Sequence, residues 1–377
     1  MSFRMDRWKI PMYRILTDKN DISHTSKVIR RGMSWAIGPE IDEFESKLAK
    51  YVKSDYCITF NSGTSAQHAS LIAAGIREKH RVAVPSFTFI STANSVLMVN
   101  AKPVFIDIEE ESYGMSPESF QKSVTSNTKA VMPIHYGGGM CRIEEIADIA
   151  KRKKILLIED AAESLGTRTG RRMAGSFGEM AVFSFAGNKV LTTGEGGAVV
   201  TNSKKLYEKL KLIRSHGRRE IENYFQSNLK PDYISLGYNW RMSSITAALG
   251  LSQLGKIGKL ISMRQKNARH LSSELEKIGI HVPKENNFDH VYQIYSVLLA
   301  SKKKRDGLMN HLTKKGIMSK IYFEPVHKTE FYKKLGYSTN LPLTDKVSQQ
   351  ILSLPIFPDM KKLEIKLIVD SVSEFVK

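Results

Sequence analysis

The chain has 377 residues, of which 41% are hydrophobic, and this length and composition predict a folded protein of two domains. Its formal net charge is +19, but it contains no recognised nucleic-acid-binding module and no interleaving of aromatic and basic residues, which argues against nucleic acid as a partner. Two distant cysteines, a charged N-terminus and the absence of a long apolar run argue against a disulfide framework, a thiolate metal site and membrane insertion, and favour a cytoplasmic protein.

Seven short apolar runs alternate with helical patterns in the first two thirds of the chain. They begin at residues 57, 81, 103, 129, 154, 180 and 197. Helices are predicted around 41–52 and over 65–75, 91–99, 143–152 and 204–215, and the glycine-rich stretch 135–140 is a connection. Strands that alternate with helices predict an α/β fold with a mostly parallel seven-stranded sheet, covered on both faces.

The pattern changes after about residue 250. A long helix is predicted over 259–277, followed by a strand within 290–300, a helix over 303–315, a strand over 317–323 and two final helices. We therefore expect a large domain over residues 1–250 and a smaller α+β domain over residues 251–377.

Three motifs follow predicted strands, where ligands gather in open α/β sheets. The first, "NSGTSA" at 61–66, combines a helix start with hydroxyl side chains, so that it fits either phosphate binding or ordinary helix capping. In the second, Phe87 is either a platform for a planar cofactor or a core aromatic. In the third, Asp160 ends an apolar strand, where a carboxylate requires a cationic partner such as a protonated ring nitrogen. A metal is the alternative, but no ligand cluster accompanies Asp160.

Lys189 stands between a predicted strand and the turn "TTGEGG". The surrounding sequence lacks the spacing of a phosphate-binding P-loop and that of a dinucleotide-binding turn. A lysine, an aspartate and a phosphate-competent loop beyond three strands match what pyridoxal phosphate requires: an amine for a Schiff base and an acidic partner for the ring nitrogen.

The order of these motifs resembles the DegT/DnrJ/EryC1/StrS family of pyridoxal-phosphate-dependent nucleotide-sugar aminotransferases, which have fold type I. The resemblance runs along nearly the whole chain. It includes "GPEIDEFESKLAKYV" at 38–52, "VPSFTFISTANSV" at 84–96, "IEDAAESLG" at 158–166, "FSFAGNKVLTTGEGGAVVTN" at 183–202 and "LGYNWRMSSITAALGLSQL" at 236–254.

The resemblance implies a role for each site residue. It makes Lys189 the covalent attachment point and catalytic base, Asp160 the partner of the pyridine nitrogen and Phe87 the residue that stacks on the ring. Phosphate binding falls to Gly63, Thr64, Ser65 and Ser184, and Asn239 reaches the cofactor phosphate of a neighbouring subunit, so that a homodimer is expected. No metal site is expected.

Three further residues have less defined roles. Glu163 stands where many relatives have Gln in "EDAAQ", so that a contact with the cofactor hydroxyl requires a different protonation state. His327, in "PVH", resembles part of a substrate loop, and His135 ends a strand. Both histidines are candidate substrate-binding residues, with ordinary structural roles as the alternatives.

The implied reaction moves the amino group of L-glutamate to a keto-sugar nucleotide. The segment around Lys189 is most similar to enzymes that aminate 4-keto-6-deoxy sugar nucleotides, including perosamine synthases that act on a GDP-linked sugar. Related 3-aminotransferases have nearly the same cofactor residues, and a catalytically idle regulatory or binding protein that retains the fold is the alternative from another class. Lys189 argues against the dehydratase branch, which has histidine at this position.

Overall fold

The computed structural model describes residues 8–219, 227–228, 230–284 and 289–377, and its centre is a seven-stranded sheet. The strand order is β1-β9-β8-β5-β4-β2-β3, and every neighbouring pair is parallel except those made by β9. The strands are β1 (Tyr56–Phe60), β2 (Arg81–Pro85), β3 (Lys102–Ile106), β4 (Thr128–Val131), β5 (Leu156–Asp160), β8 (Met180–Ser184) and β9 (Gly197–Thr201). All seven predicted strands and the mostly parallel sheet are confirmed.

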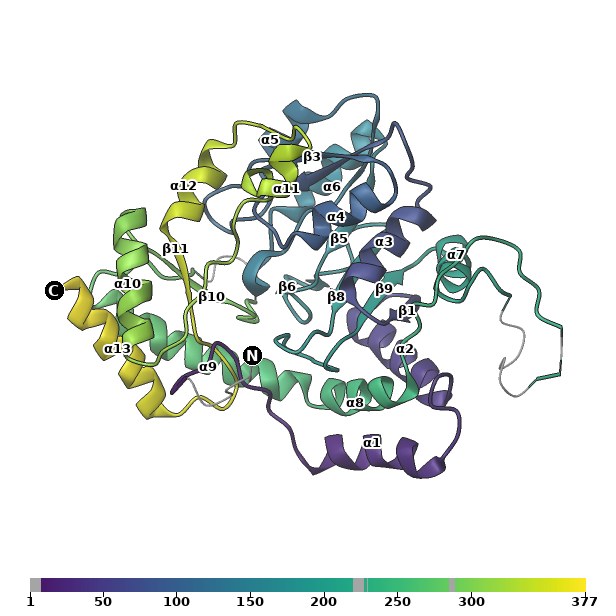
Figure 1. Cartoon of the computed structure of the whole chain (residues 1–377), viewed down its shortest axis with the longest axis horizontal. Coiled ribbons are helices and arrows are strands. Elements are labelled where there is room, and N and C mark those ends of the chain that lie inside the picture. The colour runs from purple at the N-terminus through teal and green to yellow at the C-terminus, as the bar shows by residue number, and fades with distance from the viewer. Residues whose placement is uncertain (1–7, 220–226, 229, 285–288) are drawn as a thin grey trace.

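Helices cover both faces of this sheet (Figure 1). One face packs against α2 (Pro39–Val52), α6 (Ile143–Lys153) and α8 (Ser244–Gly255), with Phe44 and Leu48 fully buried. The other packs against α3 (Gly63–Ala73), α4 (Ser91–Met98) and α7 (Lys204–Arg214), with Leu71 and Val96 fully buried. Because helices cover both faces of the sheet, its strands are continuous apolar runs rather than alternating apolar and polar residues.

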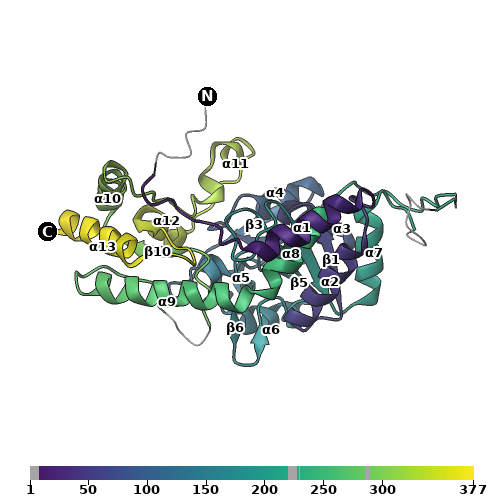
Figure 2. The same cartoon turned by 90° about the horizontal axis from the view of Figure 1, so that it is seen from below.

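Helix α1 (Lys19–Arg31) was not predicted from the sequence, because its apolar stripe is narrow. It packs across α8, as Figure 2 shows. Asp18 caps its first turn by accepting hydrogen bonds from the amides of Asn20 and Asp21. Lys256 Nζ pairs with both Asp18 and Asp21, so that the helix is fixed by its N-terminal end and by buried Val28.

A second core is formed at the opposite end of the molecule by α9 (Ile257–Glu276), α10 (Lys302–Lys314), α13 (Lys362–Val376) and the antiparallel pair β10 (Tyr295–Leu298) and β11 (Ile351–Leu354). Ile10, from the N-terminal segment, is buried in this core, so that the chain contributes to it from both ends. The boundary expected at residue 250 falls inside α8.

The predicted strand over 317–323 is not a strand in the structure. This segment makes only isolated bridges, from Ile317 to Ile10 and from Lys320 to Ser353. The strand that pairs with β10 is instead β11, which was missed because its four residues directly follow α12 (Pro342–Gln350). The remaining elements are α5 (Pro117–Ser123), α11 (Glu330–Lys334), the hairpin β6 (Arg168–Thr169) and β7 (Arg172–Met173), and the 3₁₀ turns Tyr136–Gly138 and Val326–Lys328.

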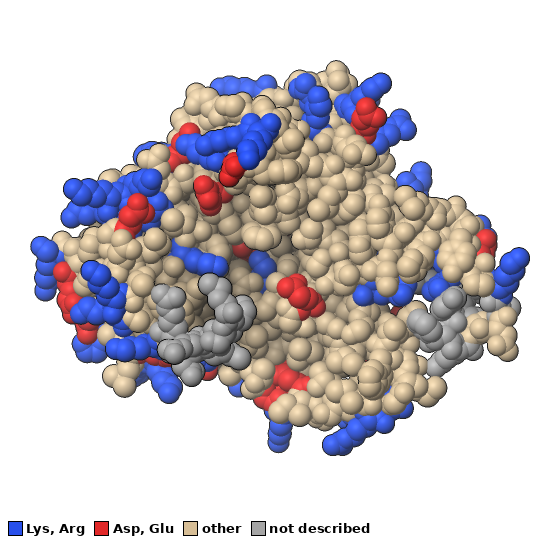
Figure 3. Space-filling view, viewed as in Figure 1, with Lys and Arg blue, Asp and Glu red and all other residues tan. Residues whose placement is uncertain are grey.

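Basic side chains lie mainly along the edges of the face in Figure 3, and the centre of that face is hollowed. Among the described residues, no helix combines the length and apolarity needed to cross a membrane. Within the same part of the chain, no group of three or more His, Cys, Asp or Glu side chains is arranged to hold a metal ion.

Candidate active site

A cavity of about 500 Å³ lies at the edge of the sheet where β1, β5 and β8 end. Asp160 is the last residue of β5, Ser184 is the last of β8, and Gly63 begins α3 just after β1. The opposite wall comes from the N-terminal segment and the 317–323 segment, through Tyr13, Lys320, Tyr322 and Phe323. The cavity is therefore enclosed by residues from distant parts of the chain.

Asp160 is buried at the base of the cavity and is held by donors on one side. Its Oδ2 accepts hydrogen bonds from Gln67 Nε2 at 2.8 Å and from Thr92 Oγ1 at 2.7 Å. Its Oδ1 accepts one longer bond, at 3.3 Å, from the amide of Ala162. Burial raises the pKa of Asp160, while the bonds from Thr92 and Ala162 and the charge of Lys189 oppose that rise.

Lys189 follows β8 in a turn, and its side chain reaches back into the cavity. Its Nζ lies 3.4 Å from Glu163 Oε1, and the other oxygen of Glu163 accepts a hydrogen bond of 2.9 Å from the amide of Gly137. Burial raises the pKa of Glu163, and the charge of Lys189 and the Gly137 bond partly offset that effect. The cavity thus joins an amine to a carboxyl group in poorly solvated surroundings.

The N-terminus of α3 faces the same cavity. Ser62 Oγ caps the amide of Ser65, which leaves the amides of Gly63 and Thr64 with no hydrogen-bond acceptor among the described residues. The positive end of a helix with free amides is suited to an anion. A Cβ on Gly63 would lie only 3.0 Å from the Cβ of Ser184, so that glycine leaves room for the neighbouring hydroxyl.

Two of the expected cofactor contacts lie elsewhere. Ser65 Oγ bonds to Asn61 Oδ1 at 2.7 Å and is not one of the residues that line the cavity. Phe87 is fully buried against Tyr136, with ring centroids 5.2 Å apart, in a separate apolar cluster. Phe89, two residues after Phe87, does line the cavity, and it is 57% exposed.

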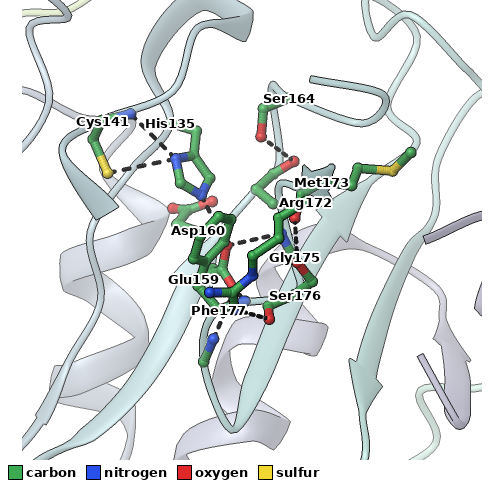
Figure 4. Close-up of polar contacts among 12 residues, drawn as sticks. His135, Cys141, Glu159, Asp160, Ser164, Arg172, Met173, Gly175, Ser176 and Phe177 are labelled. Carbon is green, nitrogen blue, oxygen red and sulfur yellow. Dashed lines mark hydrogen bonds and ion pairs between the residues drawn. The ribbon is translucent and has the colours of Figure 1, made fainter. Parts of the chain in front are cut away.

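His135 is buried and is not one of the residues that line the cavity. Its ring lies between Cys141 and Glu159 (Figure 4). Its Nε2 lies 3.0 Å from Glu159 Oε2, and its Nδ1 lies 3.4 Å from Cys141 Sγ. Burial alone would lower the pKa of His135, but contacts with Cys141 and Glu159 raise it to about 10. Glu159 also accepts bonds from the amides of Gly175, Phe177 and Gly178, so that this cluster fixes the turn that follows β7.

His327 and Asn239 also lie outside the cavity of their own chain. His327 Nδ1 lies 2.7 Å from Ser86 Oγ, and its Nε2 lies 3.3 Å from Asp345 Oδ1. Burial lowers the pKa of His327, which favours a neutral structural role. Asn239 is exposed and pairs with Ser215 through the backbone.

Several cavity residues were not found from the sequence. Gln67 follows Gly63 by one helical turn and therefore shares its face of α3, a spacing that would have located it. Lys320, Tyr322 and Phe323 come from the 317–323 segment, which is irregular, so that no simple periodicity marks them as cavity residues. No local pattern distinguishes Phe89 from Phe87, because regular alternation ends with β2 at Pro85.

The residues at the cavity fit pyridoxal phosphate. A buried carboxylate is available for a ring nitrogen, an amine for an aldehyde, and two free helix amides with the Ser184 hydroxyl for a phosphate. The volume lies within the range of small-molecule sites.

The fold and this cavity define a pyridoxal-phosphate-dependent transaminase. The sequence profile described as the "DegT/DnrJ/EryC1/StrS aminotransferase family" matches residues 16–373. The chain is 33% identical to the GDP-perosamine synthase of Vibrio cholerae over 369 residues, which is 97% of this chain and 99% of the relative. It is 32% identical to the UDP-4-amino-4,6-dideoxy-N-acetyl-beta-L-altrosamine transaminase of Campylobacter jejuni, with 94% of each chain covered.

Solved structures agree with these sequence relatives. Helicobacter pylori PseC, an aminotransferase involved in the biosynthesis of pseudoaminic acid, is 25% identical and superposes with a TM-score of 0.91 over 97% of this chain and 99% of its own. A DegT/DnrJ/EryC1/StrS aminotransferase from Brucella abortus is 32% identical, with a TM-score of 0.86 over 94% and 95% of the two chains. The chain belongs to the DegT/DnrJ/EryC1/StrS aminotransferase family and is a sugar aminotransferase.

Proposed function

We propose that this enzyme transfers the amino group of L-glutamate to C4 of a 4-keto-6-deoxy sugar linked to GDP. The observation that carries the transaminase chemistry is the cavity that holds Lys189, Glu163 and Asp160 together. The choice of sugar is supported by similarity over nearly the full length to GDP-perosamine synthases, including one from Escherichia coli O157:H7 at 32% identity.

In this proposal, bound pyridoxal phosphate supplies an electron sink for the charge that develops when the α-proton of glutamate is removed. Lys189 Nζ is the attachment point and the base that takes the α-proton and later returns a proton. Asp160 holds a proton on the ring nitrogen, and Glu163 orients Lys189 by its contact at 3.4 Å. The α3 amides, Ser184 and Phe89 hold the phosphate and the ring.

Lys320 is the residue that we propose for the second anion of the site. It lines the cavity from the small-domain side, and its Nζ lies 5.4 Å from the centroid of the Tyr322 ring, which also lines the cavity. Both glutamate and a sugar nucleotide are anionic, so that a cation at the rim would favour either of them. Lys320 is exposed at the rim of the cavity, whereas Asp160 is buried at its base. The diphosphate, as the outer part of a bound sugar nucleotide, therefore matches Lys320 better than glutamate does.

The substrate is tested with purified enzyme, glutamate and a panel of 3-keto and 4-keto sugar nucleotides that carry GDP, UDP or dTDP. We expect amino-sugar product and 2-oxoglutarate with the GDP-linked 4-keto sugar, as measured by mass spectrometry. Turnover of a UDP-linked 4-keto sugar alone would move the assignment toward the Campylobacter jejuni relative. Turnover of a 3-keto sugar alone would overturn the proposed position of amination.

The partner-subunit role expected for Asn239 remains part of this proposal, together with a homodimer. Asn239 is exposed on its own chain, beside Leu236, which is 81% exposed. Ile22, Met33 and Trp35, near α1, are further exposed apolar side chains. Burial of exposed apolar side chains is favourable, so we propose these positions for the interface with a second copy.

A further inference from the structure

We infer that Gln67 is a positioning residue for Asp160: together with Thr92 it occupies one carboxylate oxygen and leaves the other for the cofactor ring. The inference rests on the proposed pairing of Asp160 with the ring nitrogen. It concerns a residue of α3 that has no direct part in the chemistry proposed above.

The two carboxylate oxygens of Asp160 accept different numbers of hydrogen bonds. A carboxylate oxygen has two lone-pair sites, and on Oδ2 both are used, by Gln67 at 2.8 Å and by Thr92 at 2.7 Å. Within the described part of the chain, Oδ1 accepts one hydrogen bond, at 3.3 Å, from the amide of Ala162. The remaining acceptor position of Asp160 is therefore on Oδ1, and Asp160 lines the cavity.

The orientation of Gln67 is set by Asp160. Gln67 is only 2% exposed, and its buried Oε1 has no hydrogen-bond partner among the residues that the structure describes. An ionised carboxylate accepts hydrogen bonds and donates none, so that the amide presents Nε2 to Asp160 and turns its own oxygen away. A leucine here would avoid that desolvation cost, which indicates that the amide is kept for its contact with Asp160.

Thr92 is itself fixed by a second hydroxyl. Thr92 Oγ1 lies 2.9 Å from Thr88 Oγ1, and all three side chains, of Thr88, Thr92 and Asp160, are buried. The two donors reach Asp160 from different elements, Gln67 from α3 and Thr92 from α4. Asp160 is thus clamped between two helices, and both donors favour its ionised form, the form that keeps a proton on the ring nitrogen.

The test compares Gln67→Leu with Ser70→Ala in the complete enzyme. Ser70 is a buried polar residue of the same helix whose hydroxyl bonds back to the carbonyl of Ala66, 2.8 Å away. Two quantities are measured: the dissociation constant of pyridoxal phosphate from the protein, and the ¹⁵N chemical shift of ring-labelled cofactor, which reports protonation of the ring nitrogen.

We expect Gln67→Leu to weaken cofactor binding roughly tenfold, because one hydrogen bond to a charged group is lost. The ¹⁵N chemical shift should move toward the value of the unprotonated ring nitrogen. Ser70→Ala should leave both quantities unchanged. Thr92→Val should resemble Gln67→Leu, and Thr92→Ser, which keeps the hydroxyl, should restore the original values. If Gln67→Leu does not fold, the comparison of Thr92→Val with Thr92→Ser still tests whether the donors to Asp160 control cofactor binding and ring protonation.

Asp160→Ala separates this inference from the function on which it rests. If Asp160→Ala abolishes ring protonation but Gln67→Leu and Thr92→Val leave binding and chemical shift as in the original protein, the clamp is overturned and the proposed function stands. If Asp160→Ala also changes neither quantity, the proposed role of Asp160 fails.

Discussion

Lys189 is the residue on which the proposed reaction depends most directly. Its amine lies in the cavity against Glu163, and its side chain is 14% exposed. We expect Lys189→Ala to slow formation of 2-oxoglutarate from glutamate by about 10²–10⁴-fold or more, since a positioned base is lost. Circular dichroism should show an unchanged fold, and normal turnover by this variant would contradict the mechanism.

Glu163 makes the stability of the cofactor-free protein depend on pH. Burial raises its pKa above the ordinary value of 4.5. The folded state then binds the proton more tightly than the unfolded state, so that this stabilisation is complete below pH 4.5 and is lost as pH rises through the folded pKa. Lys189 opposes the effect without reversing its direction.

Glu163→Gln should therefore flatten the pH dependence of stability. The variant side chain is neutral at every pH, so that its thermal midpoint should fall less than that of the original protein between pH 4 and pH 8. Asp160, whose pKa is also raised, adds to the pH dependence of both proteins, and its charge contributes to the raised pKa of Glu163. A steeper fall in Glu163→Gln would mean that the ion pair with Lys189 outweighs burial.

At the residue scale, the positions of Asp160 and Lys189 after strands were sufficient to predict that they meet at one sheet edge, and Glu163 was found through the family resemblance; all three line the cavity. It was not sufficient for side chains whose direction depends on tertiary packing. His135 follows β4 in the same way, but its ring turns inward to Glu159, and nothing in the local pattern distinguishes the two outcomes.

At the scale of elements, the close approach of α3 to β8 should control phosphate binding. A Cβ at Gly63 would lie 3.0 Å from the Cβ and 3.1 Å from the Oγ of Ser184. We expect Gly63→Ala to raise the dissociation constant of pyridoxal phosphate roughly 5- to 150-fold, the equivalent of about 1–3 kcal/mol of overpacking. Fluorescence titration of the cofactor-free protein measures this.

Gly258→Ala is the matched control. Gly258 is the second residue of α9, as Gly63 is the first of α3, and a Cβ there meets no atom within 4 Å. The control should bind the cofactor normally and gain up to about 1 kcal/mol of stability from helix propensity. Equal cofactor affinity in both variants would remove the proposed role of the contact between Gly63 and Ser184.

The elements of the sheet were predictable because strands buried on both faces are continuous apolar runs. The elements of the small domain were less predictable. Its strands have four residues each, and β11 continues directly from α12, so that no turn residue separates the two. The 317–323 segment has the composition of a strand, but it pairs with a different partner at each bridge and never forms a ladder.

At the scale of the whole molecule, the proposed homodimer predicts that oligomeric state and cofactor binding are linked. Replacing Leu236 and Met33 by Glu would place charges on two exposed apolar positions. We expect the dimer dissociation constant to rise at least roughly 30-fold, which corresponds to about 2 kcal/mol. Sedimentation equilibrium measures it.

Cofactor affinity should fall together with dimer content, because Asn239 is proposed to reach the partner's phosphate. A suitable control is Leu363→Glu, which changes a side chain that is 77% exposed on α13, far along the chain from these residues. A protein that remains monomeric at every concentration and still binds the cofactor would contradict the shared site.

The last two residues of β5 are both acidic, and their side chains lie on opposite sides of the sheet. Glu159 gathers His135 and three amides of the 175–178 turn, while Asp160 faces the cavity. Side chains alternate along a strand, so that a single-residue deletion or insertion within β5 would exchange the two carboxylates. Such a chain would retain both acids and the apolar composition of the strand, yet lose the anchor of the 175–178 turn and the ring partner together. The length of this strand is therefore under a constraint as strict as the identity of its residues.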